Sequence, residues 1–223
     1  MSRKVYYTQV DFLESYRGKT FFGEWPTITE AFSLTVERFP DNEALKSITP
    51  TLFSLTFKEA YEKISEIAYF IKEKGIVPGD KLAVCGKNSP QWALAYLSIT
   101  FSGCVIVPLD HGLNGDELKN LIEFGDVKGI FADDDRIEVD VPGLCFRVSL
   151  DSGEKYTYIM DIKGEKSVPA KIDSNETAVI LFTSGTTGNP KGVMLSHTNL
   201  VSDAFKMLRY MTLYPEDTVY AVL

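Results

Sequence analysis

The chain has 223 residues, of which 44% are hydrophobic and 24% charged, and such a chain can bury a globular core. Its formal net charge of −8 at pH 7 argues against binding to nucleic acid or to an anionic membrane, since both need a basic surface. Three cysteines without a C-x-x-C pair argue against a disulfide framework or a zinc site and favour a cytoplasmic location. No stretch approaches the roughly eighteen apolar residues of a transmembrane helix, and we expect no signal peptide.

The first part of the chain, residues 1–53, is expected to be an appendage with turns, and a hairpin is expected around residues 44–57. The first long helix is predicted to begin after Thr56, because Glu59 three residues later completes a capping box. Apolar residues then recur at helical spacing until Gly75, which is predicted to end the helix.

From there on, short apolar segments alternate with helical patterns. Further helices are predicted over residues 88–103, 114–125 and 196–211, and the first of these is apolar on nearly every side. Strands are predicted, in chain order, over residues 82–85, 104–110, 127–133, 144–150, 177–182 and 217–223. Residues 133–143 are predicted to form a solvated loop, and residues 152–176 a polar connection.

Strands that alternate with helices indicate a mostly parallel sheet with helices on both faces. We therefore assign residues 54–223 to the α/β class as one subdomain.

The stretch LFTSGTTGNPKGVML, residues 181–195, carries the strongest functional signal. Its loop follows an apolar strand that we expect to be buried, and open α/β sheets bind ligands at the carboxyl ends of their strands. Glycines allow positive φ and a close approach of the backbone to a ligand, and successive N–H groups form an anion site. Hydroxyl groups and one lysine add donors suited to phosphate. The residues expected to hold a polyphosphate are Thr183, Ser184, Gly185, Thr186, Thr187, Gly188 and Lys191, with Gly192 as a further flexible position.

This loop is not a Walker A loop. In that motif glycine would replace Pro190, and serine or threonine would replace Gly192. Both residues also disfavour a direct entry from the loop into a helix. The alternative is a mobile glycine-rich turn with an incidental lysine, but the clustered hydroxyl groups then have no packing purpose.

The stretch FTSGTTGNPKGV closely resembles the phosphate-loop signature of the adenylate-forming superfamily, which includes acyl-CoA synthetases, luciferases and peptide-synthesis adenylation domains. Two upstream stretches, SLTFKEAYEKI (54–64) and ITFSGCVIVPLD (99–110), resemble motifs of the same family in the same order. Ala60, Ser102 and Cys104 depart from the commoner residues. The resemblance covers roughly residues 25 to 223.

The resemblance implies the amino-terminal part of a large α/β domain in a longer ATP-dependent ligase. Such an enzyme activates a carboxylic acid as an acyl-adenylate and transfers it to coenzyme A. The segments GKNSPQW and DTVYAVL resemble fatty-acyl ligases more than peptide-synthesis domains. It also implies Mg²⁺, with Thr183 as a candidate ligand, and Lys191 as a catalytic residue that stabilises the leaving phosphates. The adenine, ribose and acyl sites of the family have no counterpart here, so the chain alone is expected to be inactive.

Two alternatives stay open. One is a ligase that activates an aryl or amino acid, and the other is a non-catalytic module that binds a nucleotide or a partner.

An apolar sheet edge left uncovered would favour a homodimer.

Other polar residues carry weaker signals. His197 could face a nucleotide phosphate, but packing or capping is the favoured role, and His111 is interpreted as a surface residue. Asp110 is expected to cap a strand, and the acidic run 133–135 to form a solvated turn rather than a metal site. The remaining candidates, all interpreted as core residues, are Trp92, Tyr96, Cys85 and Cys104.

Overall fold

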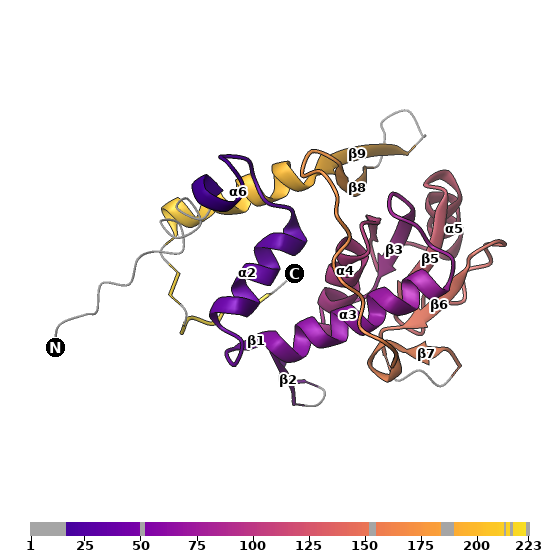
Figure 1. Ribbon diagram of the computed structural model, residues 1–223. Helices are drawn as coiled ribbons and strands as arrows, with labels where there is room; N and C mark the ends of the chain where they lie inside the picture. Colours follow the sequence, from indigo (N-terminus) through magenta and orange to yellow (C-terminus); the bar gives the residue numbers. More distant parts are fainter. Residues whose placement is uncertain are drawn as a thin grey trace.

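The computed structural model describes residues 17–49, 52–151, 155–183, 190–211, 213–214 and 216–221. Within them a seven-stranded sheet forms the centre of the molecule, and helices cover both of its faces (Figure 1). A separate two-stranded hairpin lies beside the helices. The predicted α/β class is therefore confirmed.

The helices are α2 (Ile28–Arg38), α3 (Phe57–Glu73), α4 (Pro90–Phe101), α5 (Gly115–Phe124) and α6 (His197–Tyr210), with a short 3-10 helix η1 (Ile159–Asp161). The strands are β1 (Glu43–Ser47), β2 (Phe53–Thr56), β3 (Lys81–Cys85), β4 (Val105–Leu109), β5 (Val127–Ala132), β6 (Phe146–Ser149), β7 (Thr157–Tyr158), β8 (Thr177–Thr183) and β9 (Lys191–Ser196).

The large sheet has the strand order β7-β6-β5-β3-β4-β8-β9. All neighbouring strands are parallel except β8 and β9, which are antiparallel. The chain passes from β3 to β4 on one side and then returns across β3 to β5 on the other side. The carboxyl ends of β3 and β5 therefore border a topological switch point, where open α/β sheets bind ligands.

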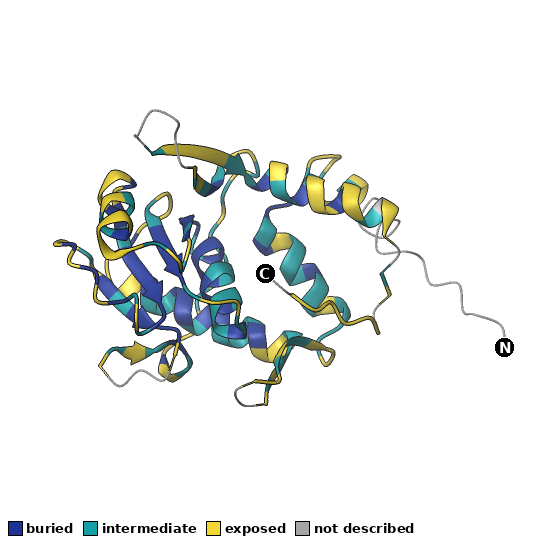
Figure 2. Ribbon diagram, turned by 180° about the vertical axis from the view of Figure 1, so that it is seen from behind, coloured by how far each residue is buried: buried dark blue, intermediate teal, exposed yellow. Residues whose placement is uncertain are grey.

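Two apolar clusters lie on opposite faces of this sheet, because side chains alternate along a strand. In β3, Leu82 and Val84 join the cluster under α3 and α4. Ala83 and Cys85 join the cluster under α5. Figure 2 shows the buried residues concentrated in these strands and in the helix faces that cover them.

Helix α3 confirms the sequence prediction at its start. The Thr56 hydroxyl accepts a hydrogen bond from the Glu59 N–H, and the Glu59 carboxylate accepts one from the Thr56 N–H, which completes the capping box. Helix α4 begins with Pro90 at its first turn and Ser89 as its cap, as its sequence predicts. The hairpin β1–β2 is also confirmed.

The amino-terminal part differs from the prediction of turns, because residues 28–38 form helix α2. Thr27 and Glu30 make a complete capping box at its start, a signal that the sequence carries and the prediction missed. Helix α2 contacts α3, α4 and α6. The division of the chain at residue 53 stays a prediction.

Two further expectations were wrong. The strand predicted over residues 217–223 is not formed in its described part, residues 217–221, and residues 222–223 lie outside the described residues. An apolar segment forms a strand only where a neighbouring strand can pair with it. Residues 133–143 are not simply a solvated loop, since Ile137, Val139 and Val141 are buried under the sheet beside α5.

Candidate functional site

The predicted phosphate loop connects the two strands of an antiparallel hairpin. Strands β8 and β9 pair along their length, and the last paired residues are Thr183 and Lys191. Directly opposed residues in an antiparallel pair project to the same face with their Cβ atoms about 5 Å apart. Both residues are exposed. The hydroxyl of Thr183 and the ammonium group of Lys191 therefore flank the base of the loop on one face of the hairpin.

The predicted phosphate-binding residues Ser184, Gly185, Thr186, Thr187 and Gly188 lie outside the described residues. Their role in phosphate binding stays a prediction. The structure does establish that β8 and β9 pair with each other and that β9 leads into α6. A strand and not a helix follows Pro190, as the sequence analysis predicts.

Strand β8 is less buried than its apolar sequence predicts. Ala178 and Val179 are buried, but Leu181 is 39% exposed and faces Val193, which is 45% exposed. Among the described residues, Ile106 of β4 and Val179 of β8 are the one pair of residues matched in the sheet register between these two parallel strands. Beyond that pair the hairpin has a mostly exposed surface (Figure 2), and Ile180 and Phe182 of β8 still pack against the cluster under α5.

Gly192 has a different role from the predicted one. It lies in β9 with a backbone that is not left-handed, and an added Cβ would lie 3.0 Å from Ile180 Cγ2 and 3.3 Å from Phe182 Cε1. The ring of Phe182 in turn packs edge-on against Phe124 at 5.8 Å between centroids. The missing side chain of Gly192 therefore makes room for β8 side chains rather than for a ligand.

His197 packs at the start of α6, as favoured from the sequence. It is 1% exposed, and its Nδ1 accepts a hydrogen bond from the Ile28 N–H at 3.3 Å. Burial lowers its pKa, while Glu176 and Glu30 act in the opposite direction. Five residues of β9 lie between His197 and Lys191, and six residue steps along a strand span roughly 20 Å. The alternative that His197 faces a phosphate at the loop is therefore wrong.

The carboxyl ends of the parallel strands carry several polar residues beside the hairpin. Gly86 and Lys87 follow β3, and Asp110 and His111 follow β4. The Asp110 carboxylate accepts a hydrogen bond from the Gly112 N–H at 2.7 Å, so its expected capping role is confirmed.

The acidic run after β5 is only partly solvated, contrary to prediction. Asp133 is 4% exposed, and its Oδ2 accepts a hydrogen bond from the Lys87 N–H at 2.9 Å. Burial raises the pKa of Asp133, and the Lys87 hydrogen bond opposes this. His111 is not simply a surface residue: its Nε2 lies 3.2 Å from Asp135 Oδ1 and 3.6 Å from Asp133 Oδ2. The segments that carry His111 and the acidic run follow β4 and β5, which lie on either side of β3 and are parallel to it, a signal that the sequence prediction did not use.

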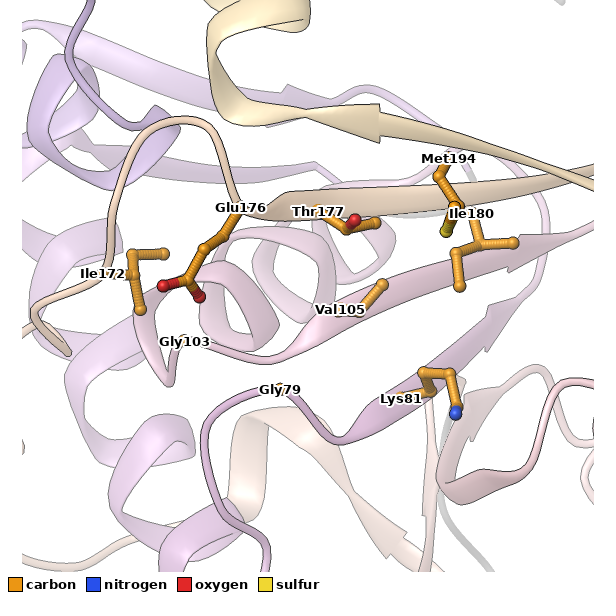
Figure 3. Close-up of a pocket in the computed structure, with 9 residues that line it drawn as sticks. All are labelled: Gly79, Lys81, Gly103, Val105, Ile172, Glu176, Thr177, Ile180 and Met194. Carbon is orange, nitrogen blue, oxygen red and sulfur yellow. The ribbon is translucent and has the colours of Figure 1, made fainter.

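Two hollows lie elsewhere in the described part of the chain. One, of about 300 Å³, lies where β3, β4 and β8 begin, with Gly79, Gly103 and Glu176 on its wall (Figure 3). It is at the amino edge of the sheet, whereas the loop leaves β8 at the opposite edge. The other, of about 390 Å³, lies between α2 and α6 and includes Tyr96. Neither hollow can therefore hold a phosphate bound at the loop.

The core interpretations of the remaining residues are confirmed. Trp92 and Tyr96 are partly buried and stack at 5.4 Å between ring centroids, and both pack against the cluster under α3 and α4. Cys85 and Cys104 are buried thiols. Among the described residues, no helix has both the length and the apolarity needed to cross a membrane.

Chemically, the hairpin base offers one ammonium group and one hydroxyl group next to a glycine-rich segment. Such a set can bind an anion with several oxygens.

Comparison with known proteins gives a consistent result. Residues 32–223 match the family model described as AMP-binding enzyme. Enterobactin synthase component F of Shigella flexneri is 29% identical over 194 residues, which are 86% of this chain and 14% of that protein. Long chain acyl-CoA synthetase 1 of Arabidopsis thaliana is 26% identical over 231 residues, covering 88% of this chain and 35% of the relative.

Among solved structures, a long-chain-fatty-acid-CoA ligase of Archaeoglobus fulgidus has the same fold, with a TM-score of 0.73 and 24% identity. The match covers 82% of this chain and 40% of that structure. The chain thus spans well under half the length of each of these three proteins.

Proposed function

Because the chain belongs to the AMP-binding enzyme family, whose members form adenylates, we propose that its β8–β9 hairpin holds the β- and γ-phosphates of ATP in an adenylate-forming ligase. The observation that carries this proposal is the pairing of Thr183 with Lys191 across the base of the glycine-rich loop. A substrate carboxylate attacks the α-phosphorus of ATP in this reaction, and pyrophosphate leaves. The hairpin residues act on the leaving group.

We assign a separate task to each part of the loop. The ammonium group of Lys191 supplies a positive charge to the phosphate oxygens that gain charge as pyrophosphate leaves. The N–H groups of residues 184–188 and the hydroxyls of Ser184, Thr186 and Thr187 donate hydrogen bonds to the same oxygens. A pre-arranged set of donors needs little reorganisation during the reaction, so positioning and charge stabilisation carry the catalytic effect.

Mg²⁺ fits this site only together with the nucleotide. Proteins hold Mg²⁺ with one or two carboxylates plus phosphate oxygens, whereas Thr183 offers a single neutral oxygen next to the positive charge of Lys191. When bound, Mg²⁺ would neutralise charge on the phosphate oxygens. We therefore propose that Thr183 is an accessory ligand to an ion that arrives with ATP.

For the acyl group we propose a fatty acid, and for the acceptor coenzyme A. The similarity to an acyl-CoA synthetase and the shared fold with a fatty-acid-CoA ligase support this proposal. The similarity to an enterobactin synthase component favours a second candidate, a ligase for an aryl or amino acid. Three free cysteines support a cytoplasmic location.

We also propose that these 223 residues function as part of a longer ligase, because they span only 35% and 40% of two of the relatives. The gene sequence beyond codon 223 tests this directly. We expect an open frame with further motifs of the family, whereas a stop codon would support a non-catalytic module.

The acyl class is tested by hydroxamate formation in that longer protein. Purified protein is mixed with ATP, Mg²⁺ and hydroxylamine, and with fatty, aromatic or amino acids in turn. We expect the highest rate with fatty acids. A higher rate with aromatic or amino acids would replace the fatty-acid proposal by the second candidate. No hydroxamate with any acid would contradict adenylate formation.

The exposed hairpin also suggests self-association. Leu181 of β8 and Val193 of the edge strand β9 form an exposed apolar pair, and exposed sheet edges promote pairing between chains. We propose a homodimer of the 223-residue chain through this surface. Light scattering should give twice the monomer mass for the wild type and the monomer mass for Val193→Lys. A wild type that stays monomeric at high concentration would contradict it.

A further inference from the structure

The carboxyl edge of the sheet carries a second group of polar side chains that the adenylation chemistry does not use. Among the described residues, His111, Asp133 and Asp135 form a group whose potential ligand atoms all lie within 4.8 Å of one another. They come from the segments that follow β4 and β5. We propose that these three side chains bind a divalent zinc ion, with water in the fourth position.

Two of the distances within this group are those expected between two ligand atoms of one metal ion. His111 Nε2 lies 3.2 Å from Asp135 Oδ1 and 3.6 Å from Asp133 Oδ2. A charge-assisted N–H···O hydrogen bond measures about 2.8 Å. Two ligand atoms on a tetrahedral zinc ion, each about 2.05 Å from the metal, lie about 3.4 Å apart. The two measured distances bracket this value.

The surrounding backbone fixes the buried ligand. The Asp133 side chain is 6% exposed, and its Oδ2 accepts a hydrogen bond from the Lys87 N–H. An added Cβ on Gly86 would lie 2.5 Å from Asp133 Oδ1, so the absence of a side chain there makes room for the carboxylate. A carboxylate has further lone pairs, and Oδ2 therefore remains able to bind a metal.

The other two ligands are accessible and also oriented. The His111 side chain is 23% exposed and that of Asp135 is 54% exposed, which leaves a path for an ion. Arg136 donates a hydrogen bond to the Leu113 carbonyl and lies 3.7 Å from Asp135 Oδ2. This arrangement leaves Asp135 Oδ1 directed at His111. Such outer partners commonly orient metal ligands.

The donor set also selects the metal. Imidazole suits zinc and other first-row transition metals, whereas Mg²⁺ and Ca²⁺ favour sites built from oxygen alone. Asp134 and Asp151 add negative charge nearby, which favours a divalent cation. The bound ion would join the segment after β4 to the segment after β5.

The test is a titration of the untagged 223-residue chain with Zn²⁺, followed by thermal unfolding. All variants carry Cys145→Ser, because Cys145 is exposed and its thiol could bind Zn²⁺. The ligand variants are His111→Ala and Asp135→Asn. The matched control is Asp140→Asn, which removes an acidic side chain that is 98% exposed and paired with Lys119 at 3.6 Å.

We expect Zn²⁺ at a hundred times its dissociation constant to raise the unfolding midpoint of the parent by about 5–10 °C. The control should behave like the parent, and Mg²⁺ at the same concentration should have no effect. Both ligand variants should unfold at the parent's midpoint without metal and bind Zn²⁺ at least ten-fold more weakly. The proposal is overturned by a parent without a shift, or by ligand variants that keep the parent's affinity.

Discussion

Gly129→Ala tests whether the packing between β5 and β6 is as tight as the structure shows. Gly129 pairs with Phe146 across these strands, and an added Cβ would lie 2.4 Å from Cε1 and 2.6 Å from Cζ of the Phe146 ring. The ring cannot easily move, because it packs edge-on against Phe131 at 5.2 Å and against Phe70 at 5.5 Å between centroids. The added methyl group must therefore displace a buried aromatic ring.

Overpacking of this kind costs about 1–3 kcal/mol of unfolding free energy. The lower backbone entropy of alanine in the unfolded chain offsets about 0.4–1 kcal/mol. The net loss of about 1–2 kcal/mol should lower the unfolding midpoint by about 2–8 °C for a chain of this size. Thermal unfolding followed by circular dichroism measures this shift.

Two further variants separate the steric cause from other effects. Gly115→Ala, at the first residue of α5, is the matched control, since an added Cβ meets nothing within 4 Å there; its midpoint should stay equal or rise. In a Phe146→Leu background, Gly129→Ala should cost less than in the wild type. An unchanged midpoint for Gly129→Ala, or an equal loss in both backgrounds, would refute the steric argument.

Three other predictions concern protonation, thiols and activity. Burial lowers the pKa of His197, so the unfolded state binds a proton at this residue more readily than the folded state does. Acidification below about pH 6.5 should therefore weaken the α2–α6 contact through Ile28. The stability advantage of the wild type over His197→Gln should shrink from pH 7.5 to 5.5, and a constant advantage would contradict this. Iodoacetamide at pH 7.5 should label Cys145 alone in the native protein, since burial raises the pKa of Cys85 and Cys104 to about 12. Labelling of all three cysteines before unfolding would be inconsistent with this burial. The 223-residue chain should form no hydroxamate from ATP, Mg²⁺ and fatty acids, and turnover close to that of a longer relative would contradict its proposed dependence on residues outside it.

The elements predicted best from the sequence carry local signals. Helix α3 has its capping box within four residues and a long apolar face, so its start and its buried side follow from the sequence alone. The apolar strands β3 to β6 were predicted for the same reason. Helix α2 has an equally local signal in Thr27 and Glu30, and its omission was an error of interpretation.

The elements that the sequence did not predict depend on distant partners. Strand β9 exists because it pairs with β8, and its short apolar run alone does not specify a strand. The burial of Asp133 depends on the backbone of Gly86 and Lys87, which is far away in the sequence. For the proposed phosphate site, the sequence predicted the residue types, and the structure added the pairing of Thr183 with Lys191.

The central claim is that the β8–β9 hairpin binds the phosphates of ATP, and the most direct test is the affinity of the 223-residue chain for tripolyphosphate. Isothermal titration should compare the wild type with Lys191→Ala and with the control Lys171→Ala, which removes another exposed lysine. A hydrogen bond to a charged group contributes about 1.5–3 kcal/mol, so Lys191→Ala should weaken binding by about ten-fold or more without changing the unfolding midpoint. Equal affinities in all three proteins, or no binding by the wild type, would contradict the claim.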